Sequence, residues 1–314
     1  MKAWHFTGTH QPFQRVDIPN PVAAPGRVVI DIKAAGLCHS DVGILEDPKW
    51  LGTMKELPVV PGHEGAGVIA AVGEGVTDWK VGDRVCVWPM IDLNGYLIDG
   101  AWAEQSTASP DALLRIPDGV SFAQAAAATD AGMTSVGAVM GTGEVRAGMK
   151  VGVIGFGGLG QIGARVAHLN GAEVYVAEVN ESVWERAREA GAVKVAKSIR
   201  EFKDDQLDVI VDYAGFGTTT ADAIETVRFG GRVVQVGMGK LEATINTYAL
   251  ILGKVQLFGS MGGEKSHIEE TLRWMADGEL APVITEIDFE DIPDGIDRLT
   301  QGTAVGRLVA KVAD

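Results

Sequence analysis

The sequence predicts an α/β fold in which a mostly β, barrel-like domain is followed by a doubly wound parallel sheet. Three observations indicate this fold. About the first 130 residues contain short strand-like runs between Gly and Pro residues, whereas the chain after Ala125 alternates strand-like and helical segments. A last strand-like segment, 306–312, ends the chain. The whole sequence has 314 residues, which is a typical length for two domains.

The first domain is predicted from strands that are separated by turn residues. Residues 27–33, 67–72 and 84–87 are rich in Val and Ile and lie between Gly and Pro signals. Cys86 lies in the third of these segments and is expected to be a strand residue. This pattern is typical of a small barrel.

The second domain is predicted from alternation. Its strand-like runs are residues 150–154, 173–178, 193–196, 207–213, 232–236 and 255–258, with helical candidates at 159–169, 181–190 and 218–227. Strands that alternate with helices favour a parallel sheet covered on both faces. We expect the first domain to span 1–131 and the second 132–262. A helix near 265–276 and the strand at 306–312 place 263–314 back in the first domain, so the domains are nested.

Composition and charge exclude several classes of protein. Hydrophobic residues make up 46% of the chain, which is too many for a disordered protein, and the formal net charge is −15. Acidity of this size argues against nucleic acid or an anionic membrane as partner. The sequence has no apolar run of signal-peptide or membrane-spanning length. We therefore expect a cytoplasmic protein in which both cysteines are thiols.

A glycine fingerprint predicts a dinucleotide site. Gly155, Gly157 and Gly160 follow a strand and open a helix, which is the context that G-x-G-x-x-G requires in a Rossmann domain. Glu178 ends the next strand, where an acid binds a ribose 2′-hydroxyl and repels a 2′-phosphate. The residues after it include no Arg or Lys for such a phosphate, so we predict NAD(H) rather than NADP(H). The alternative is a glycine-rich turn that binds another ligand.

Two short clusters upstream of the fingerprint carry candidate metal ligands. Cys38 and His63 supply a thiolate and an imidazole, the two ligand types that Zn²⁺ prefers. A metal that polarises an oxygen, near a nicotinamide that exchanges hydride, indicates redox chemistry on an alcohol or carbonyl group. Taken alone, a buried Cys is more often a small apolar filler, and a single His often satisfies a local hydrogen bond.

The motifs that carry these residues resemble one known family. They are GLCHSD at 36–41, PGHEGAGVIAAVGEGV at 61–76, VGDRV at 81–85 and GFGGLGQIG at 155–163. In order and spacing the chain resembles the zinc-containing medium-chain alcohol dehydrogenases over nearly its full length. The resemblance implies a GroES-like catalytic domain followed by a Rossmann domain. It is closest to a short, bacterial-type member without the lobe that holds a structural zinc.

The resemblance implies one catalytic zinc with three protein ligands. Two of them are Cys38 and His63, and the third, usually a Cys, is Asp130 in this sequence. The alternative for Asp130 is that its carboxylate caps a helix start. Segment 86–104 has one Cys and no Cys-x₂-Cys spacing, so we expect no structural zinc.

The family also implies roles for residues around these ligands. Ser40 would accept the alcohol proton, Asp41 would orient the ligating imidazole, and Glu64 would coordinate the metal transiently. Gly43 stands where many members have a relay histidine. The proton would therefore leave Ser40 through the cofactor ribose and water. Four cofactor contacts are implied as well: His39 and Arg307 at the pyrophosphate, and Thr134 and Val236 at the nicotinamide end.

These features together predict a zinc-dependent oxidoreductase that transfers hydride between NAD(H) and an alcohol, aldehyde or ketone. Trp50, Trp88 and Trp102 are candidate walls of an apolar or aromatic pocket, although each could equally be a core residue. One alternative is a zinc-free quinone or enoyl reductase of the same superfamily. Another is a non-catalytic dinucleotide-binding protein.

An assembly of identical subunits is also expected. Residues 253–259 form an apolar strand at the expected edge of the second sheet, and such an edge needs to be covered. In the family this edge pairs with a second subunit. We therefore predict a homodimer or a homotetramer built from dimers.

Overall fold

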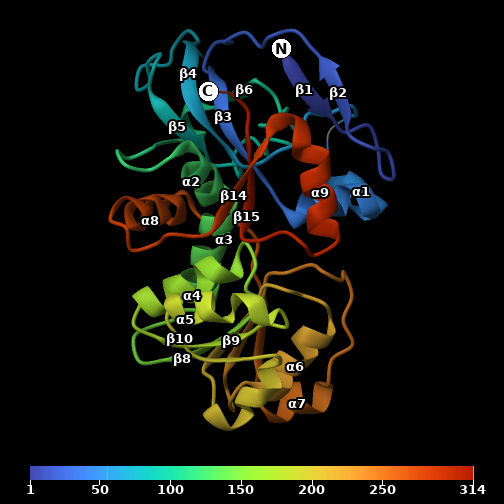
Figure 1. Ribbon diagram of the computed structural model, residues 1–314, viewed down its shortest axis with the longest axis vertical. Coiled ribbons are helices and arrows are strands. Elements are labelled where there is room, and N and C mark those ends of the chain that lie inside the picture. Colours follow the sequence, from blue (N-terminus) through green and yellow to red (C-terminus); the bar gives the residue numbers. More distant parts are fainter. Residues whose placement is uncertain (55, 314) are drawn as a thin grey trace. The chain divides into compact units, whose positions relative to one another are not determined.

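The computed structural model describes residues 1–54 and 56–313 and divides them into two compact units (Figure 1). The first unit comprises Met1–Asp130 and the segment that begins at Ile268, and the second comprises Ala131–His267. The first unit is thus made of two stretches of chain that are distant in sequence.

The first unit is built on one large mixed sheet with strand order β14-β15-β3-β4-β5-β7, in which β6 also pairs with β3. Its strands are β3 (Val28–Leu37), β4 (Gly65–Val72), β5 (Arg84–Val87), β6 (Gln105–Ala108), β7 (Leu113–Arg115), β14 (Ile284–Asp288) and β15 (Arg307–Lys311). A separate hairpin pairs β1 (Lys2–His5) with β2 (Gln14–Asp17). The late strand β15 runs antiparallel to β3, so the chain does return to the first unit.

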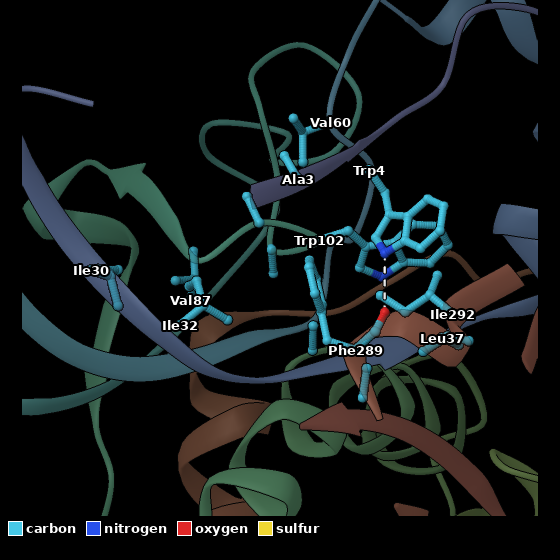
Figure 2. Close-up of a cluster of buried hydrophobic side chains, with 14 of the residues drawn as sticks. Ala3, Trp4, Ile30, Ile32, Leu37, Val60, Val87, Trp102, Phe289 and Ile292 are labelled. Carbon is cyan, nitrogen blue, oxygen red and sulfur yellow. Dashed lines mark hydrogen bonds between the residues drawn. The ribbon is translucent and has the colours of Figure 1, made fainter. Parts of the chain in front are cut away.

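Aliphatic side chains, with a few aromatic ones, fill the core of this unit (Figure 2). Trp102 is fully buried, and its ring forms a T-shaped pair with Phe13, with ring centroids 5.1 Å apart. The Trp4 indole N–H donates a hydrogen bond of 3.0 Å to the Phe289 carbonyl, which anchors the segment before helix α9 (Ile292–Thr300). The expectation that Trp102 lines a substrate pocket is therefore wrong, because its ring belongs to the core.

Short helices connect the strands of the first unit. They are α1 (His39–Glu46), the 3₁₀ turns η1 (Pro48–Thr53), η2 (Pro110–Ala112) and η7 (Phe289–Asp291), α2 (Phe122–Ala127), α8 (Lys265–Ala276) and α9 (Ile292–Thr300). Ser121 caps α2 by accepting a hydrogen bond from the Gln124 N–H. The chain then continues through a π-helical turn, η3 (Ala128–Gly132), in which Asp130 lies.

The second unit is a six-stranded parallel sheet with strand order β10-β9-β8-β11-β12-β13. Its strands are β8 (Lys150–Ile154), β9 (Glu173–Ala177), β10 (Ala192–Ala196), β11 (Val209–Asp212), β12 (Arg232–Gln235) and β13 (Gln256–Gly259). In order of appearance this arrangement is 3-2-1-4-5-6, the order of dinucleotide-binding doubly wound sheets. The predicted parallel sheet is confirmed, with β13 at one edge.

Helices connect these strands. They are α3 (Met133–Val136), the π-helical η4 (Gly137–Thr142), α4 (Gly160–Leu169), η5 (Glu181–Val183), α5 (Trp184–Glu189), η6 (Ile199–Asp205), α6 (Thr218–Thr226) and α7 (Thr247–Leu252). The predicted helix at 181–190 begins as a 3₁₀ turn, in which the Asn180 side chain accepts a hydrogen bond from the Ser182 N–H.

Two strands of the first unit extend beyond their predicted limits. β3 continues to Leu37, and β4 begins at Gly65. Both extensions consist largely of Ala and Gly, residues with weak strand propensity, but they pair with each other, as in the Ala35–Gly65 pair. This pairing brings the ends of the two strands to the candidate site. In the part of the chain that the structure describes, no helix is both long enough and apolar enough to cross a membrane.

Gly62 provides a test of this packing. Its φ is +93°, and a Cβ there would overlap the buried indole of Trp102. We expect Gly62→Ala to lower the free energy of unfolding by about 2–5 kcal/mol, which combines backbone strain with overpacking. Gly75 has a φ of +84° but open space around it, so Gly75→Ala should cost only about 1–2 kcal/mol. Equal losses in denaturant unfolding would contradict the packing argument.

Candidate active site

The first candidate ligand lies where a strand turns into a helix. β3 ends at Leu37, and Cys38 is the N-cap of α1. The Asp41 carboxylate accepts a 2.8 Å hydrogen bond from the Cys38 N–H, and the Asp41 N–H donates to the Cys38 carbonyl at 3.0 Å. The GLCHSD segment therefore folds as a capped turn that fixes the position of the thiol.

The second cluster lies directly before β4, beside the end of β3. The Gly36 N–H donates a 2.9 Å hydrogen bond to the Glu64 carbonyl. A Cβ at Gly36 would overlap the Glu64 carboxylate, so this strand position has to be glycine for the Glu64 side chain to fit. Glu64 is fully buried, and the adjacent His63 is 8% exposed.

The third candidate, Asp130, lies in the π-helical turn η3. A π-turn widens the helix locally, and such turns occur frequently at functional sites. Asp130 lies within a continuous helical stretch that begins at Phe122, so its carboxylate does not cap a helix start.

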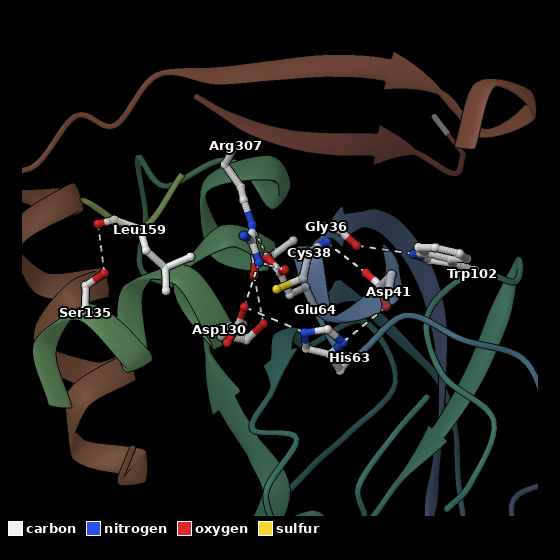
Figure 3. Close-up of polar contacts among 12 residues, drawn as sticks. Gly36, Cys38, Asp41, His63, Glu64, Trp102, Asp130, Ser135, Leu159 and Arg307 are labelled. Carbon is white, nitrogen blue, oxygen red and sulfur yellow. Dashed lines mark hydrogen bonds and ion pairs between the residues drawn. The ribbon is translucent and has the colours of Figure 1, made fainter. Parts of the chain in front are cut away.

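These three segments bring four metal-binding groups together (Figure 3). One ligand atom from each of Cys38, His63, Glu64 and Asp130 lies within 4.8 Å of all the others. His63 Nε2 is 3.6 Å from Asp130 Oδ2. A thiol, an imidazole and carboxylates are the donors that Zn²⁺ takes in proteins, so this donor set fits a zinc ion.

Arg307 joins the same cluster from strand β15. Its Nε donates to Glu64 Oε2 at 3.0 Å, and its terminal nitrogen contacts both Glu64 Oε1 and Asp130 Oδ2, the latter at 2.6 Å. Arg307 is 3% exposed. The family resemblance implies a pyrophosphate contact for this residue, and that role stays a prediction. In the structure its guanidinium is directed at the two carboxylates (Figure 3).

Charged neighbours act on the imidazole of His63 from both sides. Burial alone would lower the pKa of His63, but Tyr96, Asp41 and Asp130 nearby raise it well above its ordinary value. Nδ1 of His63 is 3.6 Å from Asp41 Oδ1, within ion-pair reach. Among residues 1–54 and 56–313 this Nδ1 has no hydrogen-bond partner. The imidazole therefore points one nitrogen at Asp41 and the other at Asp130.

The position that would hold a relay histidine is closed. A Cβ at Gly43 would come within 2.8 Å of the Trp50 indole. Trp50 thus packs over the glycine, and a larger side chain there would have to displace it. His39 directly follows Cys38 and begins α1, and burial together with the charge of Arg307 lowers its pKa.

One residue of this site had no role in the sequence analysis. The Tyr96 ring lies against His63, with ring centroids 5.5 Å apart and a 38° angle between the planes. Tyr96 belongs to the segment between β5 and β6, where only the tryptophans were singled out. No motif marks this tyrosine, because its place beside His63 depends on how its loop folds.

The glycine loop of the second unit has the geometry that its sequence predicts. Gly155 has a φ of +85°, and a Cβ at Gly160 would overlap the Gly155 carbonyl. Around Gly157 there is nothing within 4 Å of a Cβ position, so its backbone is open to a ligand. The Ser135 hydroxyl donates to the Leu159 carbonyl at 3.0 Å and braces the loop from helix α3 (Figure 3).

The acid at the end of β9 is tied to this loop. Glu178 accepts 2.7 Å hydrogen bonds from the backbone N–H groups of Phe156 and Asn180, one on each carboxylate oxygen. Of the other predicted cofactor contacts in this unit, Val236 directly follows β12 and its N–H donates to the Asp212 carbonyl at 3.0 Å. Thr134 lies in α3 and is buried.

Known families match this architecture over most of the chain. Residues 24–118 match the alcohol dehydrogenase GroES-like domain, and residues 158–277 match the zinc-binding dehydrogenase domain. An alcohol dehydrogenase of Geobacillus stearothermophilus is 32% identical over 99% of this chain and 100% of its own length. The chain belongs to the zinc-type medium-chain alcohol dehydrogenase family. The predicted combination of a GroES-like and a Rossmann domain is confirmed, as is the expectation of an enzyme.

Solved structures of this dehydrogenase family share the fold. The alcohol dehydrogenase of the hyperthermophilic archaeon Aeropyrum pernix is 26% identical, with a TM-score of 0.90 over 99% of this chain and 100% of that one. The acetophenone reductase of Geotrichum candidum, determined in complex with NAD, is 26% identical with a TM-score of 0.89, over 99% and 97% of the two chains.

The buried ion cluster predicts a large stability effect. Arg307→Met would leave the Glu64 and Asp130 carboxylates buried without their cation, so in chelator-treated protein the free energy of unfolding should fall by about 3–5 kcal/mol. The matched control is Arg15→Met, which removes a pair with the exposed side chain of Glu290 and should cost at most about 1 kcal/mol. Equal effects of the two substitutions in urea unfolding would show that the buried cluster is not a stabilising element.

Proposed function

We propose that this alcohol dehydrogenase family member transfers hydride between NAD(H) and an alcohol, aldehyde or ketone at one catalytic zinc. The observation that carries the proposal is the convergence of donor atoms from Cys38, His63 and Asp130, with Glu64 beside them. Three separate segments supply these groups, and a metal site is the arrangement that explains a thiol, an imidazole and two carboxylates at such short range.

Cys38, His63 and Asp130 would hold the metal. Both oxygens of Glu64 contact Arg307, so Glu64 is not counted among the three permanent ligands. It would coordinate the metal only transiently. When bound, zinc acts as a Lewis acid that polarises the substrate oxygen. Asp41 would orient the His63 ring from its Nδ1 side. Ser40 would accept the proton that leaves the substrate hydroxyl, while its own hydroxyl proton passes on to the cofactor ribose and water.

The second unit would bind the dinucleotide. Gly155 and Gly160 shape the turn, and the open backbone at Gly157 is available to a pyrophosphate at the N-terminus of α4. Glu178 favours a free ribose 2′-hydroxyl. The NAD complex of the Geotrichum candidum relative supports NAD(H) as the cofactor. Val236 and Thr134 stay proposed nicotinamide contacts. His39 and Arg307 stay proposed pyrophosphate contacts, and Arg307 would have to loosen its carboxylate pairing to reach one.

Substrate and assembly are further parts of the proposal. Trp50 and Trp88 remain candidates for the wall of an apolar or aromatic substrate pocket. For assembly, strand β13 lies at a sheet edge with all four of its residues exposed, including Leu257 and Phe258. An exposed apolar edge strand invites pairing with another chain, which supports a homodimer or a tetramer of dimers. A cytoplasmic location stays a prediction.

A zinc-free reductase is the second candidate function. One observation favours it: Arg307 already compensates both carboxylates of the cluster, so the site is electrostatically satisfied without a metal. A zinc-free reductase does not need the thiol of Cys38 and the imidazole of His63 at the same place. Their presence there favours the zinc-dependent dehydrogenase. Metal analysis separates the two.

Removal of Asp130 tests the metal site. We expect Asp130→Ala to lose most of its zinc after dialysis, and its NAD-linked activity to fall at least about 100-fold, because two ligands remain where a catalytic site needs three. Zinc is counted by atomic absorption against protein concentration. Asp118→Ala, at an exposed carboxylate, is the control and should keep both zinc and activity.

Full zinc and full activity in Asp130→Ala would remove Asp130 from the ligand set. An active wild-type protein that contains no zinc would favour the zinc-free reductase.

Cofactor choice tests Glu178. The wild-type enzyme should show a higher kcat/KM with NAD⁺ than with NADP⁺, and Glu178→Ala should shift that ratio toward NADP⁺ by about 10-fold or more, because the repulsion of a 2′-phosphate is removed. Glu189→Ala, at an exposed carboxylate of the following helix, should leave the ratio unchanged. A wild-type preference for NADP⁺ would contradict the role assigned to Glu178.

A further inference from the structure

Backbone pairing on both sides fixes the position of Arg307. It is the first residue of β15, and its N–H donates a 2.9 Å hydrogen bond to the Val283 carbonyl. The next residue, Leu308, pairs with Leu37 at the end of β3, directly before Cys38. The arginine side chain therefore leaves the sheet at a defined place, next to the turn that carries the thiol.

Arg307 holds the carboxylate of Glu64 with two nitrogens. Its Nε donates to Glu64 Oε2 at 3.0 Å, and its terminal nitrogen donates to Oε1, so a planar fork meets both oxygens (Figure 3). Both side chains are buried. Such a pair resists separation, because either charge alone would be left without a partner and without water.

The same guanidinium also contacts a candidate ligand of the metal. The terminal nitrogen of Arg307 donates to Asp130 Oδ2 at 2.6 Å. This is the oxygen that lies 3.6 Å from His63 Nε2, the nitrogen of a second candidate ligand. A metal held by His63 and Asp130 would therefore draw on an oxygen that already accepts a hydrogen bond from a cation. The guanidinium keeps its charge at any pH at which the protein is folded.

The charges turn this arrangement into a competition. Glu64 and Asp130 carry two negative charges, and Arg307 carries one positive charge in the same buried cluster. A divalent cation at these carboxylates gains their attraction but is repelled by the guanidinium, and the repulsion is strong where water does not screen it. The cation must also weaken the ion pairs that Arg307 makes.

We propose that Arg307 competes with zinc for these carboxylates, which lowers the metal affinity of the site and keeps Glu64 out of the ligand set. The proposal rests on the proposed function, in which Cys38, His63 and Asp130 hold the metal. While Arg307 occupies both oxygens of Glu64, the site offers three protein ligands, and one coordination position stays open for the substrate. Without the guanidinium, Glu64 becomes a fourth ligand and closes that position.

The direct test is the zinc dissociation constant of Arg307→Met, measured by competition with a chromophoric chelator in the absence of NAD⁺. We expect it to fall by about 10-fold or more, because a repulsive charge and two ion pairs no longer oppose the metal. General damage to the site would weaken zinc binding instead, so the direction of the change separates competition from a structural role. Arg15→Met, which breaks the pair with the exposed side chain of Glu290, is the control and should leave the constant unchanged.

A second variant covers the case in which Arg307→Met does not fold without metal. Arg307→Lys keeps a cation at this place, but a single ammonium group cannot reproduce the fork that meets both oxygens of Glu64. The zinc affinity of Arg307→Lys should therefore lie above that of the wild type and below that of Arg307→Met.

A double-mutant cycle tests the part of Glu64. In a Glu64→Gln background only one of the two contested carboxylates remains, so the gain in zinc affinity from Arg307→Met should be smaller than in the wild-type background. Crystal structures of the zinc-loaded proteins give a readout that is independent of turnover. Glu64 should bind the metal in Arg307→Met and should contact Arg307 in the wild type.

The outcomes are distinct. An unchanged or weaker zinc affinity in both Arg307→Met and Arg307→Lys would overturn the competition. An equal gain with and without the Glu64 carboxylate, or a Glu64 side chain that stays off the metal in Arg307→Met, would overturn the exclusion of Glu64. A wild-type protein that binds zinc but turns over no alcohol or carbonyl substrate with NAD(H) would contradict the proposed function, and the ratio of the zinc dissociation constants would still decide whether Arg307 competes.

Discussion

The arrangement of the candidate site depends on one buried ion cluster, in which the guanidinium of Arg307 lies between the carboxylates of Glu64 and Asp130. The three residues come from β15, the turn before β4 and the π-turn η3, which are far apart in sequence. Because a buried charge without a partner is costly, each of them fixes the place of the others. The pairing of β15 with β3 next to Gly36 delivers the arginine to this position.

Much of the fold could be predicted from the sequence because its local signals agree. The strands and helices of the second unit follow from alternation, and the conformations of Gly155 and Gly160 follow from the fingerprint alone. It could also be predicted that the last strand belongs to the first unit, since a strand-like tail after a complete parallel sheet needs another sheet to pair with. The ends of β3 and β4 could not be predicted, because the Ala and Gly residues there form strands only by pairing with each other.

The candidate site was predicted in part, and its misses share a cause. Cys38 and His63 could be proposed because motifs mark them, and Asp130 because it stands where the family usually has a third cysteine. The pairing of Arg307 could not, since no spacing relates it to Glu64 or to a π-turn. Tyr96 is placed by backbone packing around Gly62 and Gly95, and Trp102 lies in the core because Gly62 leaves room for its ring. Contacts of this kind arise only from tertiary structure.

The central claim is that zinc binds to one thiolate, one imidazole and one carboxylate. X-ray absorption at the zinc edge of the protein tests it most directly, because the method counts scattering atoms by type and distance. The account predicts a single sulfur at about 2.3 Å, with nitrogen and oxygen neighbours at about 2.0–2.2 Å. A site with two or more sulfurs, or with none, would contradict it.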